Sequence, residues 1–256
     1  MCAQAHDVLK ENLVVGDTGA GLVARELQAQ AGEFGRAVVE HDARARRRVC
    51  DQRREGAGQP GHFEAGSYVT RLDVPSKLDR SEGDVHAAGN PHIQQNPHNI
   101  ALVATALSKR LAELNPADAA YFQARNADFS ARWNAAMLKW EKQAAPLRNV
   151  AVVEHHKNME YLMGWLGMHQ VGTLEAKPGV EPSAAHLGEL LAQLQRQPAK
   201  MVLRAGYQDG RASQWLSEHA KIPAVQVPFT VGGDDKAKDL FSLFDVTVQR
   251  VLEANN

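Results

Sequence analysis

The sequence predicts an α/β fold, in which two lobes of parallel sheet flanked by helices are joined by one long rigid helix. Short apolar runs alternate with amphipathic stretches in the last 110 or so residues, as in βαβ units with parallel strands. A helical pattern of unusual length precedes them. Hydrophobic residues make up 44% of the chain and charged residues 23%, which is ordinary for a globular protein.

The predicted C-terminal sheet has four strands. Their apolar runs have the length of buried strands and lie at residues 150–154, 171–175, 201–205 and 224–228. Helical patterns follow them at residues 158–167, 183–197, 211–220 and 236–253. Ser183 is a candidate N-cap. In sheets of this kind, ligands bind beyond the carboxyl ends of the strands.

The long helix is predicted over residues 116–145, after a shorter helix over residues 100–114. Asn115 suits the capping position, Pro116 suits the first helical position, and Pro146 ends the pattern. About 30 residues at roughly 1.5 Å each span on the order of 45 Å. That length suits a strut between two lobes.

The N-terminal part of the chain has a different texture. Seven arginines crowd between Arg36 and Arg54, whereas no lysine occurs between Lys10 and Lys77. Such a run is typical of a solvated face or a disordered segment. We therefore divide the chain into an atypical Arg-rich segment, disordered or mis-framed, then the remainder of the N-terminal lobe, the connecting helix and the C-terminal α/β lobe, at residues 1–58, 59–114, 115–146 and 147–256.

Charge and composition exclude several kinds of protein. A formal net charge of -1 gives no basic field for nucleic acid. Cys2 and Cys50 form no CxxC pair, which excludes a structural thiolate zinc site. No apolar run approaches the roughly 18–20 residues of a membrane-spanning helix, and the start lacks the features of a signal peptide. If a metal binds, it binds at a local site.

Histidines supply the candidate chemistry. His92 follows Asn90 and Pro91 in a predicted loop, while His155 and His156 directly follow a predicted strand. At least one of the latter pair should therefore project at the ligand-binding edge. Imidazole ligands without thiolate suit zinc or manganese. For each of these histidines, the alternative to metal binding is a hydrogen-bonding or surface role. We favour that role for five others, which are His86, His98, His169, His186 and His219.

Three ordered motifs, at residues 89–99, 156–162 and 181–183, resemble those of the metal-specific (zinc/manganese) periplasmic solute-binding proteins of ABC importers, and the resemblance covers about residues 58–256. Residues 89–99 resemble the family's His-Ile-Trp-Leu-x-Pro-x-Asn segment, with Gln94 in place of tryptophan. Residues 156–162 resemble the His-Asp-Ala-Phe-x-Tyr-Phe element, and residues 181–183 its Glu-Pro-Ser turn. The resemblance implies that His92 and His156 are metal ligands.

The family's first and fourth ligands have no clear counterpart. Its first histidine stands in a Pro-His context in the N-terminal lobe. The histidines upstream of His86 are His6, His41 and His62, and none of them has these surroundings. Its final aspartate would fall near Val231, so Asp234 or Asp235 is close enough to substitute. We take Asp234 as the third candidate ligand. We expect an incomplete N-terminal lobe, from a truncated, frameshifted or fused gene.

The implied function is that of a periplasmic, monomeric protein that binds zinc or manganese between its lobes and delivers the ion to a membrane permease. The metal is then a transported ligand, and no reaction is catalysed. One alternative is a metal-dependent hydrolase with Glu154 or Glu160 as general base, although no HExxH motif occurs. Another is a folded remnant with an incomplete metal site. The sequence does not identify the metal.

Overall fold

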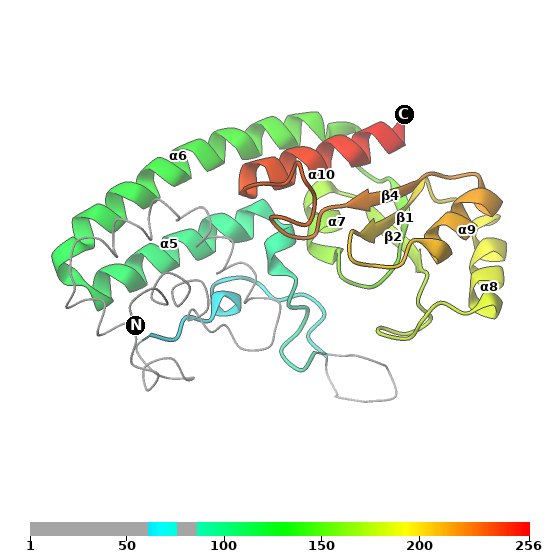
Figure 1. The fold of residues 1–256 in the computed structure, drawn as a ribbon, viewed down its shortest axis with the longest axis horizontal. Coiled ribbons are helices and arrows are strands. Elements are labelled where there is room, and N and C mark those ends of the chain that lie inside the picture. The colour runs from blue at the N-terminus through cyan, green and yellow to red at the C-terminus, as the bar shows by residue number, and fades with distance from the viewer. Residues whose placement is uncertain (1–60, 76–85) are drawn as a thin grey trace, which may run out of the picture. The chain divides into compact units, whose positions relative to one another are not determined.

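The computed structural model describes residues 61–75 and 86–256, which form two compact units (Figure 1). One unit contains the described residues 61–70 and 97–136, and the other contains residues 71–75, 86–96 and 137–256. The whole of the predicted Arg-rich segment, residues 1–58, lies outside the described residues. Among those residues, no helix is both long and apolar enough to cross a membrane.

The second unit is built on a four-stranded parallel sheet with the order β2-β1-β3-β4. Its strands are β1 (Ala151–Glu154), β2 (His169–Thr173), β3 (Met201–Ala205) and β4 (Ala224–Val227). The predicted α/β class and parallel sheet are confirmed. β2 begins two residues earlier than predicted, because His169 already pairs with β1 and its N–H donates to Val150 O at 3.0 Å.

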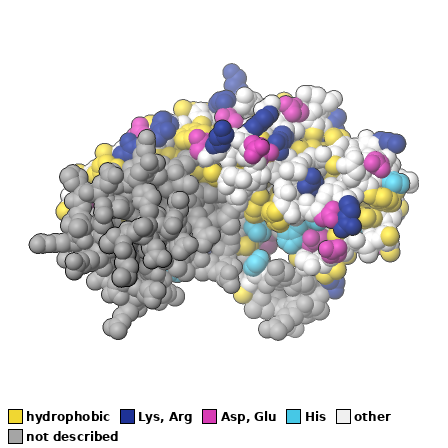
Figure 2. All heavy atoms as spheres, in the orientation of Figure 1, with side chains coloured by type: hydrophobic (Ala, Val, Ile, Leu, Met, Phe, Trp, Pro, Cys, Tyr) yellow, Lys and Arg dark blue, Asp and Glu magenta, His cyan; other side chains and the backbone are white. Residues whose placement is uncertain are grey.

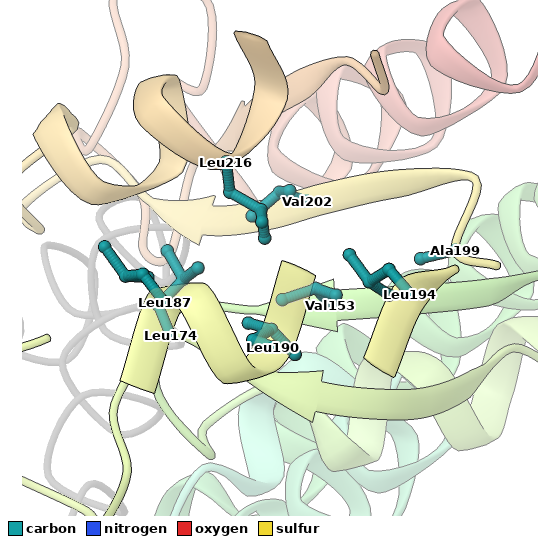
Figure 3. Packing of buried hydrophobic residues seen from close by; sticks show 8 residues of the cluster. All are labelled: Val153, Leu174, Leu187, Leu190, Leu194, Ala199, Val202 and Leu216. Carbon is teal, nitrogen blue, oxygen red and sulfur yellow. The ribbon is translucent and has the colours of Figure 1, made fainter. Parts of the chain in front are cut away.

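Helices cover both faces of this sheet (Figure 1). They are α7 (Glu160–Leu166), α8 (Ala184–Leu194), α9 (Arg211–Ala220) and α10 (Leu240–Asn255). α8 and α9 pack on one face, where Figure 3 shows their leucines against strand residues in a buried cluster of Val153, Leu174, Leu187, Leu190, Leu194, Ala199, Val202 and Leu216. α7 and α10 lie on the other side of the sheet (Figure 1).

Two of these helices begin at side-chain caps. Ser183 Oγ accepts a hydrogen bond from His186 N at 3.2 Å, as the predicted cap of α8 requires. α10 begins at Leu240 and not at residue 236, so its predicted start was wrong by four residues. The reason is that Asp239 forms a capping box with Ser242, whose backbone N–H donates to Asp239 Oδ1 at 2.7 Å.

The described part of the first unit is helical. α5 (Pro97–Leu114) packs on the N-terminal part of α6 (Ala119–Gln143), where Trp133 Nε1 donates to Pro97 O and Ser108 Oγ donates to Phe122 O. Short 3-10 turns flank α6 at Pro116–Asp118 and Ala145–Leu147. The 25 residues of α6 span about 37 Å, and the boundary between the units falls within it. Any strands of the predicted N-terminal sheet fall outside the described residues.

Candidate metal site

The candidate metal-site residues of the second unit lie near the carboxyl ends of the strands. β1 has β2 on one side and β3 on the other, so the direction of winding reverses between β1 and β3. Ligands of α/β sheets bind outside the strand ends at such a switch point. His155 directly follows β1 and pairs with β3, because its N–H donates to Leu203 O at 2.8 Å. The polar residues that follow these strands therefore face one region.

His156 is held by a carboxylate from the neighbouring strand. Its Nδ1 lies 2.7 Å from Glu175 Oε2, and the two side chains are 20% and 13% exposed. β1 and β2 are adjacent, and Leu174 N and Glu175 N continue their pairing by donating to Glu154 O and His155 O. The pairing brings the loop after β2 beside the loop after β1. His156 thus lies at the ligand-binding edge, with one ring nitrogen already occupied.

His155 is the more buried of the two adjacent histidines. Its Nε2 lies 3.7 Å from Glu175 Oε1, and its side chain is 8% exposed. Burial lowers the pKa of His155, an effect that the Glu175 carboxylate partly offsets. Within the described residues, its Nδ1 has no hydrogen-bond partner. His155 is therefore a neutral, enclosed imidazole behind the more accessible His156.

Aromatic side chains border the same edge. Tyr207, which follows β3, accepts a hydrogen bond at its hydroxyl from Asn158 Nδ2 at 2.8 Å. Its ring meets Phe229, which follows β4, edge to face with centroids 5.4 Å apart. Phe229 in turn meets the ring of His92 at 5.3 Å. A continuous series of contacts thus runs from His92 to Asn158, two residues after His156.

His92 caps a short 3-10 turn, Ile93–Gln95, in the loop where the sequence predicted it. Its ring lies edge to face with the rings of His86, at a centroid distance of 6.3 Å, and of Phe229. Gln95, buried at 5% exposure, fastens the turn because its Nε2 donates to Phe229 O at 3.0 Å. These contacts hold His92 against the loop that follows β4.

Asn90 connects the His92 loop to α7. Its Nδ2 donates to Glu160 Oε2 at 2.9 Å and to Asp73 Oδ2 at 3.2 Å, while its Oδ1 accepts from His92 N at 3.0 Å. Asp73 also accepts from Lys157 Nζ at 3.1 Å. The neighbours of both candidate histidines, Asn90 and Lys157, therefore share one carboxylate.

Asp234, the third predicted ligand, is engaged by α10. Its Oδ2 lies 2.6 Å from Arg250 Nη2, and its Oδ1 accepts from Lys236 N at 2.9 Å. The Lys236 N–H, followed by the Arg250 guanidinium, lowers the pKa of Asp234 below its usual value. The carboxylate is thus charged at neutral pH. To bind a metal ion, Asp234 would have to give up its ion pair with Arg250.

Glu154 and Glu160 are poorly suited to act as general bases. Glu154 is fully buried, accepts from Met159 N at 3.1 Å and from Gln170 Nε2 at 2.5 Å, and holds the end of β1 to the start of α7. Burial, and then the charge of Glu160, raises the pKa of Glu154 well above its usual range. Glu160 is bonded to Asn90. Both carboxylates hold structure together, which disfavours the hydrolase alternative.

Comparison with protein families identifies the family of this chain. The model of the family described as ZnuA, zinc-uptake complex component A periplasmic, matches residues 21–254, which is most of the chain. The chain belongs to this family. ZnuA-family proteins are metal-binding, periplasmic solute-binding components of ABC importers and not a catalytic family. The resemblance seen in the sequence motifs is confirmed, but the match begins at residue 21 and not near residue 58. No curated protein matches the sequence.

Solved structures share the fold of this ZnuA-family chain. A ZnuA crystal structure is 20% identical with a TM-score of 0.63, covering 76% of this chain and 69% of its own. FpvC of Pseudomonas aeruginosa in complex with Mn²⁺ is 19% identical with a TM-score of 0.63, covering 78% and 72%. A mutant of the laminin-binding adhesin Lmb of Streptococcus agalactiae is 17% identical with a TM-score of 0.59, covering 74% and 70%.

The candidate ligands of this ZnuA-family chain are only partly assembled. Figure 2 shows histidine side chains gathered beside acidic ones on one face of the molecule. His92 and His156 border the same strand ends, whereas Asp234 is bound to Arg250. Within residues 61–75 and 86–256, no three His, Cys, Asp or Glu side chains are arranged to hold a metal ion. Of the upstream candidates, His6 and His41 lie outside the described residues.

Glu175 and Phe229 are among the residues of this site that the sequence motifs did not single out. Glu175 was predicted as the last residue of a strand, and the rule that selected His156, a polar residue at the carboxyl end of a strand, applies to it equally. Phe229 had no comparable signal. An apolar residue after a strand is ordinary, and only the fold brings it against His92.

Proposed function

We propose that this chain captures a divalent cation, zinc or manganese, and delivers it to the membrane permease of an ABC importer. His92 and His156 serve as ligands, and Asp234 is the third candidate. The protein acts in the periplasm as a monomer. It binds the ion as cargo and performs no chemistry on it.

The observation that carries the proposal is the position of the two imidazoles. His156 follows β1 and His92 packs on Phe229, which follows β4, so both border the carboxyl ends of one sheet. The contacts through Tyr207 and Asn158 link the two loops. Ligand sites of α/β sheets lie at this edge, which supports a shared ion for two residues far apart in sequence.

The donor set favours zinc over manganese. Imidazole suits zinc, whereas manganese prefers carboxylate and water ligands. Both histidines offer nitrogen, while Asp234 supplies oxygen only after it leaves Arg250. A site with two histidine ligands therefore supports tighter binding of zinc than of manganese. Water or further ligands would complete a tetrahedral shell around the zinc ion.

Isothermal titration with zinc and with manganese tests the proposal on the metal-free protein. We expect one ion per chain, and H92A and H156A should each weaken binding by more than the roughly 10–100-fold that loss of an outer-shell partner costs. H169A is the matched control, because His169 is exposed at the opposite, amino end of β2. It should bind as the wild type does.

Three other results would contradict the proposal. Unchanged affinity in both H92A and H156A would remove these residues from the site. Absence of binding by the folded wild-type protein would favour a remnant with an incomplete site. Turnover of ester or peptide substrates that depends on the added metal would favour a hydrolase.

A further inference from the structure

Glu175 places a carboxylate against two consecutive histidines. Its Oε2 lies 2.7 Å from His156 Nδ1, and its Oε1 lies 3.7 Å from His155 Nε2. The carboxylate comes from the loop after β2 and the histidines from the loop after β1. Because parallel pairing aligns these strand ends, the backbone of the sheet brings the two loops beside each other.

Backbone and side-chain hydrogen bonds within the loop after β2 fix the position of this carboxylate. Gly179 N donates to Glu175 Oε2 at 2.7 Å, the same oxygen that His156 contacts. Thr173 Oγ1 donates to Glu175 O at 2.6 Å, and Val180 N donates to Lys177 O at 3.0 Å to close the turn. The side chain of Glu175 is only 13% exposed. Its orientation is therefore fixed by backbone and side-chain bonds on both sides.

A carboxylate in this position decides where the imidazole proton sits. An ionised carboxylate only accepts hydrogen bonds, so a neutral His156 must carry its proton on Nδ1. Its Nε2 then keeps the lone pair that a metal ion needs. Metal-binding histidines commonly donate their second ring N–H to a carboxylate, which fixes the tautomer and raises the basicity of the ligand.

We infer that Glu175 is a positioning residue that prepares His156, and not His155, to bind the cation. The inference rests on the proposed function. The two imidazoles are neighbours in sequence, but the 2.7 Å contact goes to the more exposed ring, whereas the 3.7 Å contact goes to the enclosed one. Glu175 thus selects which histidine presents a free Nε2 to the ion.

Three variants of the full chain test this role. E175A removes the acceptor, and E175Q keeps it, because an amide oxygen in the place of Oε2 still accepts from both His156 Nδ1 and Gly179 N. E181Q changes an exposed carboxylate of the same loop and serves as the control. Circular dichroism checks that each variant is folded.

The first readout is the tautomer of His156 in the metal-free protein. Histidine ¹⁵N NMR, recorded above the pH at which imidazole titrates, should show the Nδ1–H form in wild type, E175Q and E181Q. E175A should shift His156 towards the Nε2–H form that predominates in free imidazole side chains. An Nδ1–H tautomer that persists in folded E175A would overturn the inference, whether or not the protein binds metal.

The second readout is zinc affinity by isothermal titration. E175A should bind zinc about 10–100-fold more weakly, E175Q should lose less, and E181Q should match the wild type. Wild-type affinity in E175A would refute the role in metal capture. So would loss of one oxygen ligand from the zinc X-ray absorption spectrum of E175A, because Glu175 would then be a ligand itself. A wild-type protein that binds neither metal would fail the proposed function, whereas the tautomer measurement tests the positioning separately.

Discussion

Replacing Asn90, which is not itself a candidate ligand, with alanine should destabilise the second unit. The Asn90 side chain is buried at 6% exposure and links the His92 loop, the segment around Asp73 and the start of α7. N90A removes all three hydrogen bonds at once. It leaves the Glu160 carboxylate and the His92 N–H without the partner that the structure gives them.

The expected magnitude follows from the exposure of the partners. A hydrogen bond to a charged group contributes roughly 1.5–3 kcal/mol and a neutral one roughly 0.5–1.5 kcal/mol. Asp73 has a side chain that is 38% exposed, so water can replace Asn90 there and we leave that bond out. The bonds to Glu160 and to His92 N together predict a loss of about 3 kcal/mol in the free energy of unfolding.

Urea denaturation of the metal-free protein measures this loss as a lower midpoint at an unchanged slope. Because the chain has two compact units, hydrogen exchange over residues 86–96 and 160–166 locates the effect in the unit that contains Asn90. N134A, an exposed asparagine on α6, should stay within about 0.5 kcal/mol of the wild type. An equally small change in N90A would refute the reasoning.

Two further predictions concern buried charge. Because burial raises the pKa of Glu154, the folded chain keeps a proton that the unfolded chain releases. Its free energy of unfolding should therefore fall as the pH rises from the usual glutamate pKa towards that of the buried group. E154Q should lack this part of the pH dependence when the free energy of unfolding is measured by urea titration. Identical pH profiles for E154Q and the wild type would contradict this prediction. R250M should tighten zinc binding about five-fold, since the Arg250–Asp234 pair opposes metal binding by about 1 kcal/mol; unchanged titrations would remove Asp234 from the site.

Much of the fold could be predicted because its elements are local. Short apolar runs predicted the four strands of the second unit, and Ser183 as a candidate N-cap predicted the start of α8. The errors fell at element ends. The backbone pairing of His169 with Val150 started β2 two residues earlier, and the Asp239 capping box started α10 four residues later. In each case a specific backbone conformation or hydrogen bond overrode the periodic pattern.

The candidate site was predictable only in part. The rule that ligands bind at the carboxyl ends of strands, together with the family motifs, selected His156 and His92. It did not select Glu175, because the direction of a side chain after the end of a strand depends on the turn that follows, here closed by Gly179. The roles of His92 and His156 as metal ligands remain predictions, which the proposed titrations test.

The sequence by itself determined the order of strands and helices, the edge of the sheet at which His156 lies, and membership of the family. Periodicity and motif spacing are local properties, so they can be read without coordinates. Only the tertiary structure decided that Glu175 meets His156, that Phe229 meets His92 and that Arg250 holds Asp234. These contacts join separate segments, and their geometry is set by strand pairing and helix packing, which no local pattern encodes.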